Sequence, residues 1–230
     1  MEFTDIAMEL SKEAWQASFH HPFVLQLQEG TLEPSIFRYY LIQDAYYLKS
    51  FSEAYHLLAD KTSNEKMKRL LKQNAQSLVE GELFIRQQFF KELGISDQEM
   101  DEQPIAPTCY HYISHIYRQF AEPNLGIAFA SLLPCPWLYH DLGKALNRNP
   151  SPNTLYQQWI ETYITDELEQ QIKEEEALVN QLYRESDETD KQKMLEAFHR
   201  SVHMEAKFWE MAYQHQTWTS DLQSLEKEKK

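Results

Sequence analysis

Apolar side chains recur three and four positions apart along most of this chain, and this spacing restricts its fold more than any other feature. The spacing puts them on one face of an α-helix, whereas a half-buried strand alternates every second residue. No alternating stretch is sustained, and five glycines in 230 residues disfavour a turn-rich all-β fold. We expect helices near 3–19, 34–60, 64–93, 107–121, 124–147, 152–182 and 188–214, with a further short helical start at 96–99.

The pattern also predicts how the chain is divided. No linker and no internal repeat separates one part of the helical pattern from another. We therefore predict a single all-α domain, a helical bundle, over residues 1–222. Residues 223–230 form a charged C-terminal tail.

The charge of the chain excludes several classes of partner. The sequence has 22 lysines and arginines against 36 aspartates and glutamates, a net charge of −14. Nucleic acid and anionic membranes repel such a surface, so neither is expected as a partner, whereas a neutral or cationic small molecule is compatible. Solubility alone also accounts for an acidic surface. Glycine-rich phosphate-binding motifs are absent from the sequence.

The sequence shows no targeting segment. Its first residues are acidic and lack the basic and long apolar regions of a signal peptide. The longest nearly apolar run, 125–139, is shorter than the ~20 residues of a membrane span and is interrupted by prolines. Two cysteines, Cys109 and Cys135, are too few for a disulfide scaffold. We therefore expect a cytoplasmic protein.

Cys135 lies between two prolines in an otherwise apolar and aromatic segment, 132–139. Pro136 has no amide N–H and its ring clashes with the preceding turn, so a helix here is expected to kink. Pro136 should also push Cys135 out of α-helical geometry. A thiol on a distorted, buried helix is a candidate nucleophile. The alternative is a small core side chain beside a packing kink, which is the usual role of a free cysteine.

Two carboxylates lie on apolar helix faces. Asp44 lies in the middle of a stripe of apolar and tyrosine side chains. That stripe consists of Phe37, Tyr40, Leu41, Tyr47, Leu48, Phe51, Tyr55 and Leu58. Glu205 is flanked in the same way by Met194, Phe198, Ser201, Val202, Phe208, Trp209 and Ala212. Burial of a carboxyl is costly without hydrogen bonds, and it raises the pKa into the range of general acid–base catalysis at neutral pH. Core tyrosine hydroxyls that satisfy such a carboxyl are the structural alternative.

A rival metal-binding pattern occurs twice. Glu53-x-x-His56 and Glu196-x-x-His199 have the spacing found in di-iron carboxylate bundles. On the helical wheel, however, Glu53 lies opposite Asp44 and Glu196 lies opposite Glu205. Both pairs should therefore face solvent if the apolar stripes face the core, and we expect no metal site.

Several motifs together resemble the TenA family, also called thiaminase II. In chain order they are His21-Pro22-Phe23-Val24, Gln43-Asp44 with Tyr46-Tyr47-Leu48, Leu133-Pro134-Cys135-x-Trp137-x-Tyr139, Trp159-Ile160-x-x-Tyr163, and Glu205-x-x-Phe208-Trp209-x-Met211-Ala212-Tyr213. The resemblance extends from about Trp15 to Trp218 and is to the cysteine-bearing branch of the family.

The resemblance implies an all-α fold like that of haem oxygenase, without haem, metal or another cofactor, and a homotetramer. It implies hydrolysis of 4-amino-5-aminomethyl-2-methylpyrimidine and of thiamine. The product would be 4-amino-5-hydroxymethyl-2-methylpyrimidine, which re-enters thiamine synthesis.

The resemblance also assigns roles to residues. Cys135 would be the nucleophile and Glu205 the acid and base, while Asp44 would bind the aminopyrimidine edge. Four tyrosines would stack on the ring or hydrogen-bond to it: Tyr47, Tyr112, Tyr139 and Tyr163. Core packing is the alternative for each tyrosine taken alone.

Two other interpretations of the chain remain. One is a di-iron oxidase of similar helical architecture. The other is a non-enzymatic regulator or binding protein, although the acidic charge and the lack of a basic helix-turn-helix argue against direct DNA binding.

Overall fold

The part of the chain that the computed structural model describes, residues 1–79 and 84–218, consists of α-helices without a β-strand. In the first half these are α1 (Phe3–Phe19), α2 (Pro22–Glu29), α3 (Pro34–Lys61), α4 (Glu65–Ser77), α5 (Phe84–Leu93) and α6 (Asp97–Glu102). In the second half they are α7 (Pro107–Gln119), α8 (Leu125–Leu132), α9 (Pro134–Leu146), α10 (Thr154–Glu161), α11 (Asp166–Glu185) and α12 (Glu188–Tyr213). The predicted all-α class is confirmed.

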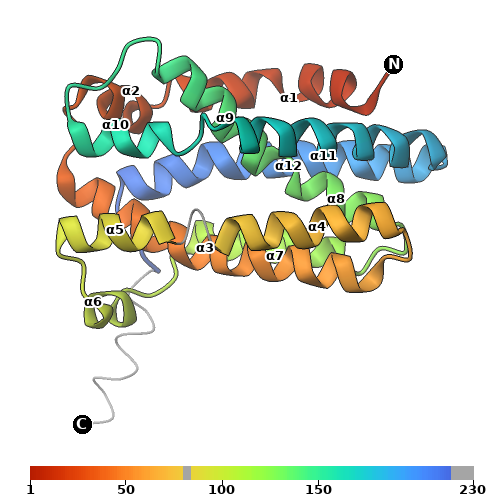
Figure 1. The fold of residues 1–230 in the computed structure, drawn as a ribbon, viewed down its shortest axis with the longest axis horizontal. Coiled ribbons are helices and arrows are strands. Elements are labelled where there is room, and N and C mark those ends of the chain that lie inside the picture. The colour runs from red at the N-terminus through yellow and green to blue at the C-terminus, as the bar shows by residue number, and fades with distance from the viewer. Residues whose placement is uncertain (80–83, 219–230) are drawn as a thin grey trace, which may run out of the picture.

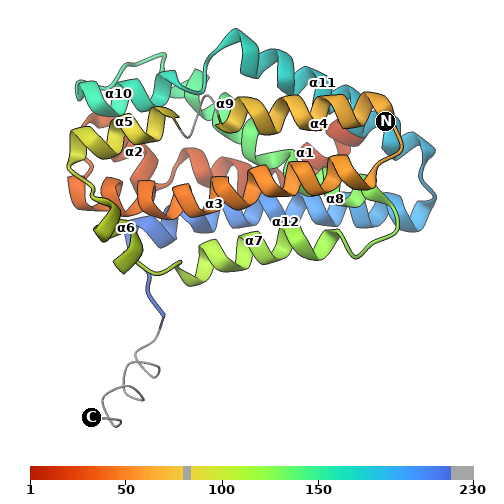
Figure 2. The same ribbon diagram turned by 60° about the horizontal axis from the view of Figure 1, so that its bottom comes forward.

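The two longest helices, α3 and α12, run along the length of the molecule (Figure 1). Helix α12 packs against α1, α3, α7, α8 and α9, and α3 packs against α4 and α7. Figure 2 shows α3, α7 and α12 side by side. Because both long helices have neighbours on several sides, polar side chains on their inner faces are removed from water.

Side-chain caps define where two of the helices begin. Asp187 accepts a hydrogen bond from the backbone N–H of Asp190 at 2.8 Å at the start of α12. Thr165 accepts one from the N–H of Leu168 at 3.2 Å at the start of α11. Each cap satisfies a first-turn amide that has no partner within its helix, which stabilises the helix by ~1 kcal/mol.

Two of the predicted helices are interrupted. The predicted helix 124–147 breaks at Leu133, because Pro134 lacks the N–H that would continue α8 and instead opens α9. The predicted helix 152–182 is α10 and α11, separated by residues 162–165. Thr165 adopts extended backbone angles there and caps α11.

A third predicted helix, 64–93, is also divided. Helix α4 ends at Ser77 and α5 begins at Phe84. The intervening residues 80–83 lie outside the described residues, as does the predicted tail at 223–230.

Helix α2 was not expected from the periodicity. Pro22 occupies its first turn, and the His21 side chain accepts a hydrogen bond from the N–H of Phe23 at 3.1 Å. Gly30 ends the helix at φ 73°, a left-handed conformation that glycine adopts without steric cost. Proline at the start and glycine at the end therefore mark a helix too short to show a periodic pattern.

The core follows the predicted stripes. All eight apolar and tyrosine residues predicted around Asp44 are buried, and so are the seven predicted around Glu205. Glu53 and Glu196, on the opposite faces of the same helices, are exposed. None of the described helices has the length and apolar character needed to cross a membrane.

Candidate active site

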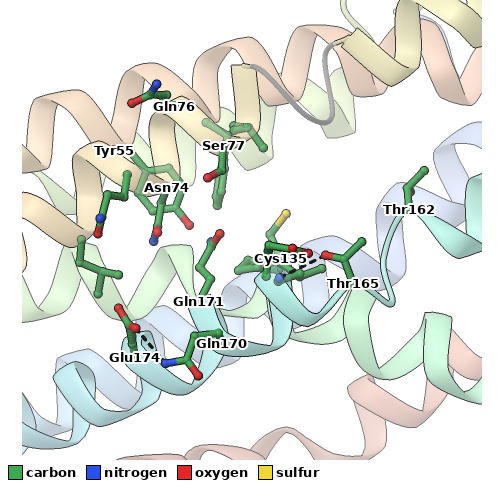
Figure 3. A pocket seen from close by; sticks show the side chains of 17 residues that line it. Tyr55, Asn74, Gln76, Ser77, Cys135, Thr162, Thr165, Gln170, Gln171 and Glu174 are labelled. Atoms are coloured by element: carbon green, nitrogen blue, oxygen red, sulfur yellow. Dashed lines mark hydrogen bonds between the residues drawn. The ribbon is translucent and has the colours of Figure 1, made fainter.

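Cys135 lies in the first turn of α9 and lines a pocket of about 730 Å³. Figure 3 shows its sulfur directed into the space between α4 and α11. The expectation that Cys135 leaves α-helical geometry was wrong. Pro134 and Pro136 both fall in the first turn, where a missing N–H breaks no helical hydrogen bond, and the interruption is instead at Leu133.

The position of Cys135 suits a nucleophile. The partial positive charge at a helix N-terminus stabilises the thiolate, which is the reactive form of cysteine. The side chain is 9% exposed, so the sulfur reaches the pocket while most of the residue is shielded from water.

Glu205 is a buried carboxyl in this region. It lies on α12, is 1% exposed, and its Oε1 accepts a hydrogen bond from the Tyr112 hydroxyl at 2.7 Å. Burial raises its pKa to about 8, the bond from Tyr112 opposes the rise, and the negative charge of Asp44 adds to it. At neutral pH the carboxyl is therefore largely protonated and can act as a general acid.

Two buried tyrosines, Tyr47 and Tyr112, interact electrostatically with both Cys135 and Glu205. The rings of Tyr47 and Tyr112 are 4.7 Å apart between centroids, with an interplanar angle of 32°. Burial raises the pKa of both phenols well above the usual value, and the negative charges of Cys135 and Glu205 raise the pKa of each further. Both hydroxyls therefore stay protonated and can donate hydrogen bonds.

Asp44, on α3, reaches the same region from another side. It is 3% exposed, and its charge raises the pKa of Glu205 and, after larger contributions from burial, Tyr40 and Glu205, that of Tyr139. Tyr139 accepts a hydrogen bond from the Tyr40 hydroxyl at 3.2 Å. The Tyr139 ring lies 4.9 Å from that of Tyr163.

The structure thus gathers all the predicted site residues in one buried region. They come from five separate parts of the chain: Asp44 and Tyr47 from α3, Tyr112 from α7, Cys135 and Tyr139 from α9, Tyr163 from the residues after α10, and Glu205 from α12. Of these, Cys135 also lines the open pocket.

The sequence analysis missed a third buried carboxylate, Glu175 on α11. It is 1% exposed, and its Oε1 accepts hydrogen bonds from Tyr55 at 2.9 Å, from Asn74 at 2.5 Å and from Gln171 at 3.3 Å. Burial raises its pKa to about 7, although these three hydrogen bonds act to lower it. Glu175 shares one helix face with the buried Ile172, Leu178 and Val179. That spacing was the available signal, but the run of three glutamates at 174–176 resembles a solvated face.

The rival metal-binding pattern has no geometric support. Glu53 and His56 are exposed on α3, and Glu196 is exposed on α12. His199 bonds instead to Ser11 at 3.1 Å. Within residues 1–79 and 84–218, no three His, Cys, Asp or Glu side chains come together so that they could hold a metal ion.

Comparisons with known proteins agree with this fold. An aminopyrimidine aminohydrolase from Bacillus subtilis (strain 168) is 35% identical over 219 residues, which cover 95% of this chain and 93% of that protein. A solved structure of a TenA homologue from P. horikoshii OT3 superposes with a TM-score of 0.84 at 24% identity, covering 93% of this chain and 99% of that one.

A second solved structure identifies the fold. It is a domain of unknown function with a heme oxygenase-like fold from Shewanella denitrificans OS217, with a TM-score of 0.71, 13% identity, and coverage of 94% and 93% of the two chains. The predicted likeness to the haem oxygenase fold is confirmed. The model of the TENA/THI-4/PQQC family matches residues 10–215, nearly the whole chain, and this protein therefore belongs to that family.

Proposed function

We propose that this protein is an aminopyrimidine hydrolase that converts 4-amino-5-aminomethyl-2-methylpyrimidine, and thiamine, to 4-amino-5-hydroxymethyl-2-methylpyrimidine for thiamine salvage. One observation carries the proposal. A thiol at a helix N-terminus, next to an open pocket, lies in the same region as a buried carboxyl that is protonated at neutral pH. The full-length relationship to an aminopyrimidine aminohydrolase supports it.

The reaction begins at Cys135. Its thiolate adds to an electron-poor carbon of the pyrimidine, and the new C–S bond ends the aromaticity of the ring. The displaced electron pair moves onto the amidine nitrogens. One proton is taken up with this electron pair, which leaves the adduct neutral, and it is released again when the pair returns; Asp44 holds this edge of the ring and accepts a hydrogen bond from its protonated nitrogen. The buried tyrosines stack on the ring and donate hydrogen bonds to it.

The leaving group departs in the second step. The electron pair on the amidine nitrogens returns to the ring and breaks the exocyclic C–N bond. Glu205 gives its proton to the departing amine. This leaves an exocyclic methylene on the ring. A thiazole departs from thiamine as a neutral molecule and needs no proton.

Water completes the reaction. Glu205 is ionised at this point, because it has given its proton to the departing amine or, in a thiamine turnover, to solvent, and it takes a proton from water as the oxygen adds to the methylene. The electron pair then expels the Cys135 thiolate and restores the aromatic ring. One water is consumed for each ammonia or thiazole released, and a thiamine turnover also releases one proton to solvent.

The assembly and location implied by the family resemblance are part of the proposal. We expect a homotetramer in the cytoplasm. Light scattering coupled to size-exclusion chromatography of the full chain tests the assembly, and a monomer at micromolar concentration would contradict it.

Steady-state hydrolysis tests the function. The purified chain is supplied with 4-amino-5-aminomethyl-2-methylpyrimidine and with thiamine in separate assays, and the hydroxymethyl product is quantified in both. We expect turnover of at least one substrate without added metal, and the ratio of the kcat/KM values then identifies the preferred substrate. Turnover of neither would contradict the proposed function.

A further inference from the structure

Cys135 lines an open pocket that Tyr47, Tyr112 and Tyr139 do not line, and it also interacts electrostatically with Tyr47 and Tyr112 in the buried region. The pocket is enclosed by α3, α4, the start of α9 and α11, and its volume of about 730 Å³ is in the range of small-molecule sites. The pyrimidine ring proposed above occupies the buried region among Tyr47, Tyr112 and Tyr139. The open pocket therefore has room for whatever is attached to that ring.

One wall of this pocket is polar and is organised by Glu175. Tyr55, Asn74 and Gln171 all line the pocket, and all three donate hydrogen bonds to the same Glu175 oxygen behind them. Figure 3 shows Asn74 and Gln171 close to Tyr55 at one end of the pocket, with Cys135 beyond them. A single buried carboxylate thus fixes three side chains that come from three helices.

This arrangement determines which atoms are left for a ligand. A carboxylate accepts hydrogen bonds and cannot donate them, so Asn74 and Gln171 turn their amide nitrogens toward Glu175. Their carbonyl oxygens, Oδ1 of Asn74 and Oε1 of Gln171, remain as acceptors. The wall therefore presents partial negative charge.

The formal charge of the pocket has the same sign. Glu167 and Glu174 line it, and no lysine or arginine is found among the described residues that do so. A cationic group or a hydrogen-bond donor is stabilised in such a site, whereas a phosphate group is repelled.

We propose that this pocket is the leaving-group subsite of the enzyme and that Glu175 is a positioning residue whose bonds to Asn74 and Gln171 make the subsite accept neutral or cationic leaving groups and reject phosphorylated ones. The inference rests on the proposed function, because it presupposes that a pyrimidine ring is bound at Cys135. It predicts that thiamine is hydrolysed in preference to thiamine monophosphate.

A charge reversal tests the selectivity. Glu174→Lys places a positive charge at the pocket, and its control is Glu185→Lys on the same helix. Both glutamates are exposed, and each accepts a hydrogen bond from the glutamine four residues earlier, but Glu185 does not line the pocket. We expect Glu174→Lys to shift the kcat/KM ratio of thiamine to thiamine monophosphate about tenfold toward the phosphate, and Glu185→Lys to leave it unchanged.

Glu175→Gln tests the positioning role at pH 8, where Glu175 is mostly ionised. It removes the charge and keeps the size. We expect kcat/KM for thiamine to fall about fivefold, while kcat/KM for the aminomethyl substrate and the calorimetric Kd of the hydroxymethyl product change less than twofold, because ring binding is untouched.

The outcomes separate the two proposals. If the wild-type chain hydrolyses no aminopyrimidine, the proposed function fails. If it hydrolyses them but Glu174→Lys and Glu185→Lys give the same substrate ratio, the leaving-group subsite is wrong and the function stands. If Glu175→Gln weakens product binding as much as thiamine turnover, Glu175 supports the fold of the whole site and is not a positioning residue. Should Glu175→Gln fail to fold, the pair of surface variants still decides the selectivity.

Discussion

The raised pKa of Glu205 results from the burial of its own side chain. Its position on the apolar face of α12 removes water from the carboxyl, and a single hydrogen bond from Tyr112 does not offset that loss, so the pKa rises to about 8. Burial on an amphipathic helix thus supplies the acid that the proposed reaction needs.

The pH dependence of kcat tests this role. Because the pKa of Glu205 is raised, the acidic form is present below pH 8 and is lost as the pH rises through about 8. We therefore expect kcat for the aminomethyl substrate to fall above that pH. Glu205→Gln should lower kcat at pH 7 by on the order of a hundredfold and remove this decline.

The matched control is Glu210→Gln on the same helix, which removes the charge of an exposed carboxylate that accepts a hydrogen bond from His21 at 2.9 Å. Exposed ion pairs contribute little to the free energy of unfolding, so this variant should keep the wild-type kcat and the wild-type pH profile. A Glu205→Gln enzyme whose kcat still declines above pH 8 would assign that decline to another group.

For single residues, the sequence predicts an inward-facing carboxylate only where the apolar residues on the same helix face continue without a break on both sides of it. Asp44 and Glu205 each lie within a long apolar stripe, so the helical wheel identifies them. Glu175 has charged neighbours on both sides, and its burial depends on how α11 packs against α4. Contacts between helices distant in the sequence cannot be derived from local periodicity.

Among the helices, α9 connects the nucleophile to the tyrosines. It begins at Pro134, carries Cys135 and Tyr139, and passes close to the segment after α10 at Gly143. A β-carbon at Gly143 would lie 3.1 Å from the Tyr163 β-carbon and 3.3 Å from the Ile160 carbonyl oxygen. Glycine therefore sets the distance at which Tyr139 and Tyr163 meet.

Gly143→Ala tests this close approach. Both contacts would be shorter than ordinary van der Waals distances, so the segment that carries Tyr163 has to move away. We expect a loss of ~1–3 kcal/mol in the free energy of unfolding, measured with urea, and a reduced kcat/KM. Lys144→Ala, at the next and more exposed position, removes an ion pair to Glu169 and should cost less than ~1 kcal/mol. Equal stability of wild type and Gly143→Ala would contradict a tight contact.

The sequence predicted where helices lie better than where they break. The long helices α1, α3, α7 and α12 match the expected ranges closely. The breaks at Leu133 and at 162–165 were missed because the apolar period continues across them. The proline pair did indicate an interruption, but the chain places it before Pro134, where two missing N–H groups break no helical bond.

Considered as a whole, the molecule brings together side chains that are up to 161 positions apart, from Asp44 to Glu205. Local periodicity predicted that Asp44, Tyr47 and Glu205 face inward, whereas Tyr112 and Tyr163 were expected only from the likeness to a family. That they meet in one place was expected only from the likeness of the motifs to a family, and it follows physically from the packing of α12 against α3, α7 and α9. The position of the open pocket could not be predicted, because much of its wall comes from α4 and α11, which carry none of the quoted motifs.

The central claim is that Cys135 is the nucleophile, and the second cysteine supplies the control. Cys109 is also buried, and its thiol donates a hydrogen bond to the carbonyl of Gln43 at 3.4 Å. Burial raises its pKa far above the usual value, and the charge of Asp44 raises it further, so it stays a thiol.

The most direct measurement is kcat/KM for the aminomethyl substrate with wild type, Cys135→Ser and Cys109→Ser, with circular dichroism to confirm that all three are folded. We predict that Cys135→Ser loses activity by on the order of a thousandfold or more, while Cys109→Ser stays within a few-fold of wild type. A folded Cys135→Ser protein with wild-type kcat/KM would contradict the account.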